Sequence, residues 1–139
     1  MTFSAIALCP RTGQLGVAAV TGTPGVGTLL AWALRRVGAI ATQGWVNPYL
    51  GVDGLDLLEN GHPAQKALEA VIAMDDGRDL RQLGMVDAKG RTAVWTGQDC
   101  EQWAGHRTGE GWTVQGNMLS TAETVEACAE VVSGSTGLL

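Results

Sequence analysis

Two β-like runs joined by a short turn constrain the fold of this chain more than any other feature of its sequence. The runs cover residues 2–8 and 14–21, and neither contains a charged residue. Between them, Pro10 pre-sets a turn and Gly13 can adopt a positive φ. The chain therefore opens on an antiparallel hairpin. Because both runs are apolar, we expect both strands to be buried on both faces, in a sheet that lies between other layers.

The remaining pattern predicts antiparallel hairpins around a pair of helices. After a loop, the further strands are expected at 29–35, 37–46, 82–86, 91–96 and 111–119. Helices are expected at 49–60 and 63–74, where Gly61 ends the first and Pro63 lies in the first turn of the second. A capping box of Ser120 and Glu123 predicts a last helix. The order β-β-β-β-α-α-β-β-β-α is typical of an α+β layered domain.

Length and charge limit the class of protein and its partners. A chain of 139 residues fits one domain and can bury a core without disulfides or metals. Its formal net charge of −5 argues against a nucleic-acid partner, because binding nucleic acid requires basic clusters. Met1 is followed directly by strand-like sequence, and no run approaches the length of a membrane span. We therefore expect a cytoplasmic protein with no membrane partner.

Residue types that bind metals do not form a recognisable motif. Cys9, Cys100 and Cys128 are odd in number and far apart, as expected of reduced thiols in a cytosolic protein. The two histidines, His62 and His106, have no spacing typical of a metal site. We therefore expect neither a metal nor a cofactor.

Thr2 is the first candidate for chemistry, because it directly follows Met1. If Met1 is removed, the Thr2 hydroxyl and a free α-amine share one residue. Such an amine titrates near pH ~7.7 to 8 and can accept the hydroxyl proton, so an N-terminal threonine is a nucleophile that carries its own base. The alternative interpretation of Thr2 is an ordinary first-strand residue.

Four segments of the sequence resemble one bacterial family. They are Thr2-Phe3-Ser4 and the stretches 41–48 (ATQGWVNP), 81–91 (RQLGMVDAKGR) and 103–119 (WAGHRTGEGWTVQGNML). The segments occur in the family's order and extend over nearly the whole chain. The family is the N-terminal-nucleophile (Ntn) hydrolase-like group called domain of unknown function 1028.

The resemblance implies a four-layer αββα sandwich, in which two antiparallel sheets face each other and helices cover the outside. It implies one Ntn-hydrolase-like domain over residues 1–139 and leaves open whether a C-terminal extension follows Leu139. In Ntn hydrolases the first residue of the mature chain attacks an amide carbonyl and its amine relays the proton. The implied activity is hydrolysis of an amide bond in a small or peptide-like substrate, with Thr2 as nucleophile.

Polar residues at the expected strand ends are candidates for the rest of this site. Asn117 follows Gly116 after a strand, where its amide could donate to a developing oxyanion; closing a turn is the alternative. Gln43, Trp45 and Asn47 end an earlier strand and could line the same cleft as substrate-binding residues. For Asn47, which precedes Pro48, helix entry is the alternative and the favoured interpretation.

Two loops supply the other substrate-binding candidates. Thr21 and Thr23 lie where the second strand ends, close to Thr2 if the first two strands pair through their short turn. No lysine stands there to assist the amine. His106 and Arg107 lie between glycines, where they could hold an anionic or planar ligand. Exposed loop residues without such a role are the alternative for that pair.

Two other classes of function compete with the hydrolase. The first is a non-catalytic module that binds a ligand or partner through the surfaces of Trp32, Trp45, Trp103 and Trp112, since tryptophan is favoured at interfaces. The second is a structural oligomer formed through exposed sheet edges. A homo-oligomer is the expected state of the protein.

Overall fold

The computed structural model describes residues 1–135 of the chain. Its strands are β1 (Thr2–Leu8), β2 (Leu15–Thr21), β3 (Ala31–Leu34), β4 (Gly38–Gly44), β5 (Arg81–Asp87), β6 (Thr92–Thr96), β7 (Gly105–Gly109) and β8 (Trp112–Asn117). Its helices are α1 (Gly27–Leu30), α2 (Tyr49–Glu59), α3 (Ala64–Ala73), the 3-10 turn η1 (Arg78–Leu80) and α4 (Glu123–Gly134).

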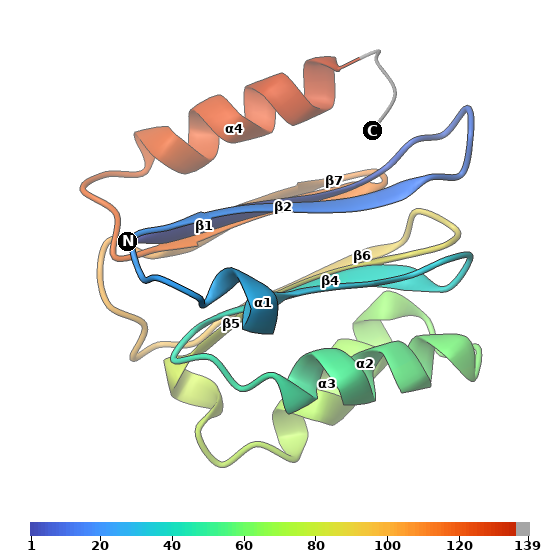
Figure 1. Cartoon of the computed structure of the whole chain (residues 1–139), viewed down its shortest axis with the longest axis horizontal. Helices are drawn as coiled ribbons and strands as arrows, with labels where there is room; N and C mark the ends of the chain where they lie inside the picture. Colours follow the sequence, from blue (N-terminus) through green and yellow to red (C-terminus); the bar gives the residue numbers. More distant parts are fainter. Residues whose placement is uncertain (136–139) are drawn as a thin grey trace.

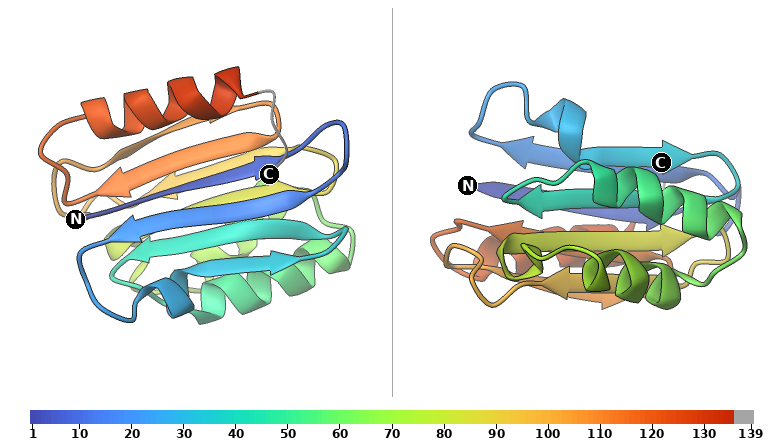
Figure 2. Two further views of the ribbon diagram at one scale, coloured as in Figure 1. Left: turned by 45° about the horizontal axis from the view of Figure 1, so that its top comes forward. Right: turned by 90° about the horizontal axis from the view of Figure 1, so that it is seen from below.

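The strands form two antiparallel sheets that lie face to face (Figure 1). The first, which we call the β1 sheet, has the order β2-β1-β8-β7, and the second, the β4 sheet, has the order β3-β4-β5-β6. Helix α4 covers the outer face of the β1 sheet, and α2 and α3 lie side by side on the outer face of the β4 sheet (Figure 2). The expected α+β class with two antiparallel sheets is confirmed.

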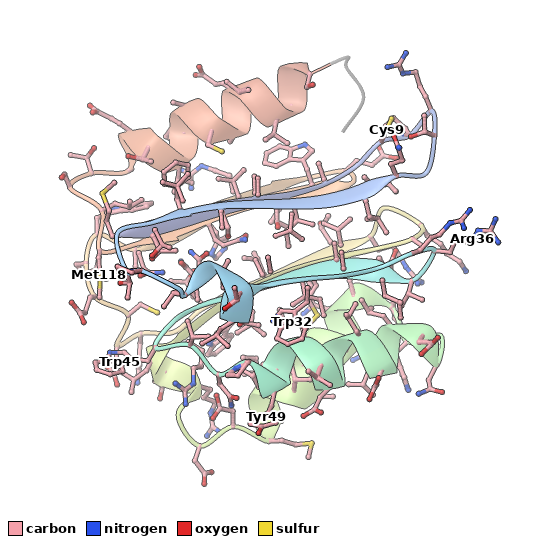
Figure 3. All side chains as sticks on the ribbon, in the orientation of Figure 1. Cys9, Trp32, Arg36, Trp45, Tyr49 and Met118 are labelled. Atoms are coloured by element: carbon pink, nitrogen blue, oxygen red, sulfur yellow. The ribbon has the colours of Figure 1, made fainter. Side chains whose placement is uncertain are left out.

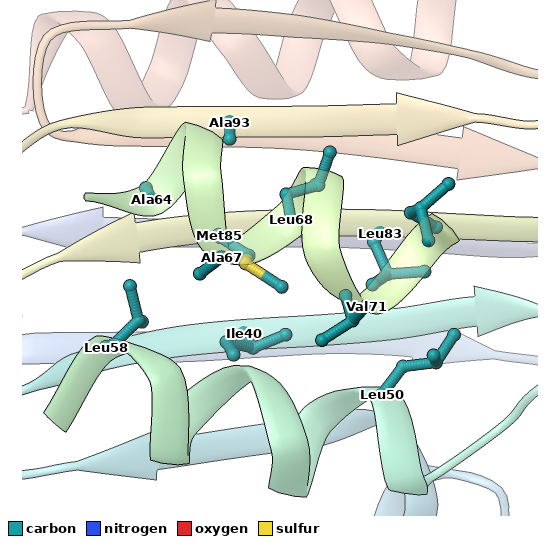
Figure 4. Packing of buried hydrophobic residues seen from close by; sticks show 11 residues of the cluster. Ile40, Leu50, Leu58, Ala64, Ala67, Leu68, Val71, Leu83, Met85 and Ala93 are labelled. Carbon is teal, nitrogen blue, oxygen red and sulfur yellow. The ribbon is translucent and has the colours of Figure 1, made fainter. Parts of the chain in front are cut away.

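Successive side chains of each strand point to opposite faces of the sheet, so the buried side chains form three packed layers. In β5, Leu83 and Met85 point towards α2 and α3, while Val86 points between the sheets and packs with Ile6 of β1. The cluster beneath α2 and α3 is the largest of the three (Figure 4). The third cluster lies beneath α4 and includes Val114. One face of each sheet is therefore packed on helices and the other on the opposite sheet.

The local signals predicted most elements near their observed positions. The β1–β2 hairpin, the β5–β6 hairpin and helices α2 and α3 are confirmed, and Gly61 has the positive φ of 90° expected after a helix. The capping box was a wrong prediction: the Glu123 N–H donates to the hydroxyl of Thr121 at 3.3 Å, and Ala122 occupies the cap position.

For three segments, the structure differs from what the sequence predicted. Strand β2 is not buried on both faces, since it forms an edge of its sheet and residues 18–20 are exposed. Residues 29–30 belong to α1 rather than to a strand. Residues 105–109, expected as a loop, form β7. This edge strand pairs with β8 on one side only and needs no run of apolar residues.

We expect Leu83→Ala to lower the free energy of unfolding by about 2–5 kcal/mol, because its side chain is wholly buried beneath α3 and its loss leaves a cavity. Urea unfolding followed by circular dichroism measures this change. Leu29→Ala is the matched control, since that side chain is 45% exposed. Equal losses in the two variants would contradict the packing described here.

Candidate active site

Thr2 begins β1, one of the two inner strands of its sheet, and its neighbours come from both adjacent strands. In the sheet register, Thr2 lies opposite Thr21 of β2 and opposite Asn117 of β8. The hydroxyl oxygens of Thr2 and Thr21 are 3.0 Å apart, within hydrogen-bond distance. The Thr2 side chain is 9% exposed and Asn117 is buried. Three sequence candidates, far apart in the chain, therefore meet at one end of the β1 sheet.

Met1 lies at the surface of this end. Its side chain is 59% exposed, and its amine is 3.7 Å from the sulfur of Met118. Figure 3 shows Met118 at the end of the sandwich where the chain begins. The carbonyl oxygen of Met1 accepts a hydrogen bond from the Gly22 N–H at 3.1 Å. Removing Met1 would therefore expose Thr2 and free that N–H.

Behind Thr2, the space between the sheets contains a network of buried amides centred on Gln82 of β5. The Gln82 Oε1 accepts hydrogen bonds from Gln43 Nε2 at 2.7 Å and from Asn117 Nδ2 at 3.1 Å. The Gln82 Nε2 donates to Thr96 Oγ1 and to the carbonyl of Gly116, both at 2.9 Å. One wholly buried side chain thus connects both sheets and fixes the amide of Asn117.

The network continues along the inner face of β1. The hydroxyl of Ser4 donates to Gln43 Oε1 at 2.6 Å and accepts from Gln115 Nε2 at 2.7 Å. Within the described part of the chain, Thr113 Oγ1 and Gln115 Oε1 have no hydrogen-bond partner. Both oxygens face Gly84, where a Cβ would overlap them. A glycine at this position therefore allows the two sheets to approach each other.

His106 is connected to the other side of the network. Its Nδ1 lies 2.8 Å from Thr96 Oγ1. Thr96 also accepts a hydrogen bond from Gln82, so one hydroxyl links Gln82 to His106. Whether the Thr96 hydroxyl or the His106 Nδ1 donates depends on the tautomer of the imidazole. Burial, assisted by the charge of Arg107, lowers the pKa of His106 below its ordinary value.

Arg107 does not share this environment. Successive residues of a strand point to opposite faces, and Arg107 reaches outward to form an ion pair with Glu126 of α4. His106 and Arg107 therefore lie on opposite faces of the β1 sheet, each with a partner in the protein. Thr23 belongs to the exposed loop after β2, and its N–H donates to Thr21 Oγ1 at 3.2 Å.

Trp45 and Asn47 lie in the loop that connects β4 to α2. Trp45 is 61% exposed, and its carbonyl accepts a hydrogen bond from Arg81, which also pairs with Asp75 at 2.7 Å. This ion pair is the main cause of a lowered pKa at Asp75. The side-chain oxygen of Asn47 accepts from the N–H of Tyr49 at 3.2 Å, at the start of α2. The geometry of Asn47 is that of helix entry.

The tryptophans expected to form a binding surface do not share a face. Trp32 packs against the cluster beneath α2 and α3, while Trp103 and Trp112 pack beneath α4. Trp45 alone among these four is exposed. Trp32, Trp103 and Trp112 therefore contribute to packing in two separate layers.

Sequence reasoning missed four members of the network: Ser4, Gln82, Thr96 and Gln115. A signal was present in β8, where Thr113, Gln115 and Asn117 alternate with apolar or small residues. That pattern is typical of a strand with one polar face, and polar outward faces are usually assigned to solvent. Here the polar face is covered by the second sheet.

Within residues 1–135, no group of three or more His, Cys, Asp and Glu side chains is arranged to hold a metal ion. No helix in that range is long and apolar enough to cross a membrane. All three cysteines are free thiols, and burial raises the pKa of Cys100 and of Cys128.

Two stacked antiparallel sheets with a buried amide network between them define an α+β protein of layered type. The chain belongs to the family of unknown function DUF1028, whose model matches residues 2–138. A solved structure of the same family, protein SPO2555 from Silicibacter pomeroyi, is 32% identical with a TM-score of 0.93. The match covers 99% of this chain and 64% of that one, so this chain spans less than two thirds of SPO2555. No curated protein matches the chain.

We expect Gln82→Leu to lower the free energy of unfolding by about 3 kcal/mol or more, because several buried polar groups lose their partner and each such loss costs about 1–3 kcal/mol. Urea unfolding measures the change. Gln65→Leu is the control with the same substitution at an exposed position of α3, and it should stay within about 0.5 kcal/mol. A mild effect at Gln82 would show that the network contributes little to stability.

The lowered pKa of His106 predicts that the stability of the protein depends on pH. Because the folded protein binds this proton more weakly than the unfolded chain does, the free energy of unfolding should fall as the pH drops below about 6.5. His106→Gln should flatten this part of the stability profile, whereas His62→Gln, at an exposed position, should leave it in place. Denaturant unfolding between about pH 5.5 and 7.5 makes the comparison; identical profiles for wild type and His106→Gln would refute it.

Proposed function

We propose that this protein is an N-terminal-nucleophile amidohydrolase that cleaves an amide bond in a small or peptide-like substrate. The observation that carries the proposal is the position of Thr2. It is the first residue of the inner strand β1, and its hydroxyl lies 3.0 Å from Thr21 Oγ1, with Asn117 opposite in the register. The stacked sheets with outer helices support the same class, because they match the layer order expected of Ntn hydrolases.

The reaction begins with removal of Met1, which leaves the α-amine and the hydroxyl on Thr2. The amine accepts the hydroxyl proton as the oxygen attacks the substrate carbonyl, and a tetrahedral intermediate forms. The amine then gives the proton to the leaving nitrogen as the amide bond breaks. Water hydrolyses the resulting Thr2 ester by the same path, which restores the hydroxyl. In this proposal Thr21, whose hydroxyl is 3.0 Å from that of Thr2, orients the Thr2 oxygen during both steps.

Two donors are available for the developing oxyanion. The Asn117 amide uses one N–H to bind Gln82 Oε1, and its second N–H remains for the intermediate. The Gly22 N–H, which binds the Met1 carbonyl in the unprocessed chain, becomes free when Met1 leaves. A single donor of this kind contributes about 2.7–4 kcal/mol to transition-state stabilisation. Gln43, by holding Gln82, positions Asn117 indirectly.

A non-catalytic binding module on the same scaffold is the second candidate. It is favoured by the exposure of Trp45, because tryptophan is enriched at binding interfaces. Both proposals include a homo-oligomer in the cytoplasm. The exposed edge strand β2 supports association between copies of the chain.

Intact mass and substitution at Thr2 test the hydrolase. We expect native protein to lack Met1 and to hydrolyse at least one compound in a panel of small amides and dipeptides. Thr2→Ala should abolish turnover, and Thr2→Ser should retain part of it, because serine also supplies a hydroxyl beside the amine. Thr108→Ala, at an exposed position of β7, is the matched control and should keep full activity.

Two outcomes would overturn the hydrolase. Native protein that retains Met1 would leave the amine on the wrong residue. Turnover that persists undiminished in Thr2→Ala would remove Thr2 from the mechanism. Retained Met1 together with saturable binding of a metabolite would favour the binding module instead.

A further inference from the structure

A cleft of about 800 Å³ lies at the end of the sandwich opposite Thr2. The β1–β2 turn forms one wall and the β3–β4 turn forms the other, with Ala88 of the β5–β6 turn between them. Figure 3 shows Arg36 at this end and Met118 at the other. Strand β1, with its seven residues, separates the two ends by about 20 Å. The cleft is therefore distinct from the candidate active site, and its volume is typical of small-molecule sites.

Two arginines give the cleft a positive charge in an acidic protein. Arg35 and Arg36 both line it, and neither forms an ion pair with the residues that the structure describes. Asp87, the buried carboxylate that precedes Ala88 in the chain, is already held by Arg91 at 2.6 Å. Glu110 lines a neighbouring cleft, where it shares the wall with Lys89. The planar guanidinium group binds phosphate and carboxylate groups with two parallel hydrogen bonds.

The backbone at Arg36 is a second, independent observation. The turn from Leu34 to Val37 is closed by a hydrogen bond from the Val37 N–H to the Leu34 carbonyl at 3.1 Å. Its third residue, Arg36, has a φ of 64°. Glycine or asparagine normally occupies such a position, because other side chains are strained there. Strained residues of this kind are concentrated at functional sites, so the positive φ makes Arg36 a candidate binding residue.

The other residues that line the cleft indicate which chemical groups the rest of the ligand carries. Leu15, Ala33 and Leu34 contribute apolar side chains, while Thr12 contributes a hydroxyl. We propose that this cleft, formed by the β1–β2 and β3–β4 turns, binds a small organic anion in which a phosphate or carboxylate group is attached to a compact apolar group. Arg35 and Arg36 bind the anionic group, and the leucines contact the apolar part. This proposal is independent of the hydrolase.

Calorimetric titration at low ionic strength tests the site with four compounds: phenyl phosphate, inorganic phosphate, phenol and benzoate. We expect phenyl phosphate to bind most tightly, because it satisfies both parts of the cleft. Benzoate, tested in parallel, distinguishes a carboxylate from a phosphate preference. Arg35→Gln and Arg36→Gly should each weaken phenyl phosphate binding about tenfold or more, as expected when a hydrogen-bonded charge is removed.

Arg36→Gly separates binding from folding, because glycine suits the positive φ and the variant should melt no lower than wild type. Lys66→Gln is the charge-matched control on α3, where Lys66 pairs with Glu69 outside the cleft, and it should bind normally. Undetectable binding of phenyl phosphate, inorganic phosphate and benzoate to wild type would overturn the proposal. So would equal affinity in the arginine variants, or phenol that binds as tightly as phenyl phosphate.

Discussion

The amide of Gln82 is buried between two sheets, and a buried amide is stable only when its donors and acceptor are hydrogen-bonded. Its partners come from β4, β6, β7 and β8, so the requirement ties four strands of both sheets to one side chain. The spacing and register of the sheets near Thr2 follow from this constraint. Asn117 lies beside Thr2 because its strand pairs with β1, but the direction of its amide depends on Gln82.

The interface between the two sheets is apolar at one end and polar at the other. Towards the turns, the inward positions are apolar, and Ile6 packs with Ala39, Ala41 and Val86. Towards Thr2 they are Ser4, Gln43, Gln82 and Gln115. Dispersion and the hydrophobic effect hold one end of the sandwich, while directional hydrogen bonds hold the other. The end with directional bonds contains the residues proposed for chemistry, where fixed dipoles in a water-poor space have most effect.

Local signals in the sequence were sufficient to predict the helices and the hairpins, whose interacting residues are close together in the chain. The β1–β2 and β5–β6 hairpins and helices α2 and α3 were predicted because turns and helical spacing are local. The proximity of Thr21 to Thr2 followed from the same hairpin. The pairing of Thr2 with Asn117 joins strands 115 positions apart, and no local pattern specifies it. Gln82, Ser4 and β7 were missed for the same reason: each is defined by a neighbour on a distant segment.

Gly84 shows how a residue without a side chain can act on a site that it does not touch. Its missing Cβ leaves room for Gln115 and Thr113 from the facing sheet. A methyl group there would act as a wedge, tilting the sheets apart at their polar half while the apolar half stayed closed. The gap would open where Gln43 and Gln82 join, and the Asn117 amide would lose its anchor. The separation of the two sheets behind Thr2 therefore depends on the absence of a side chain at Gly84.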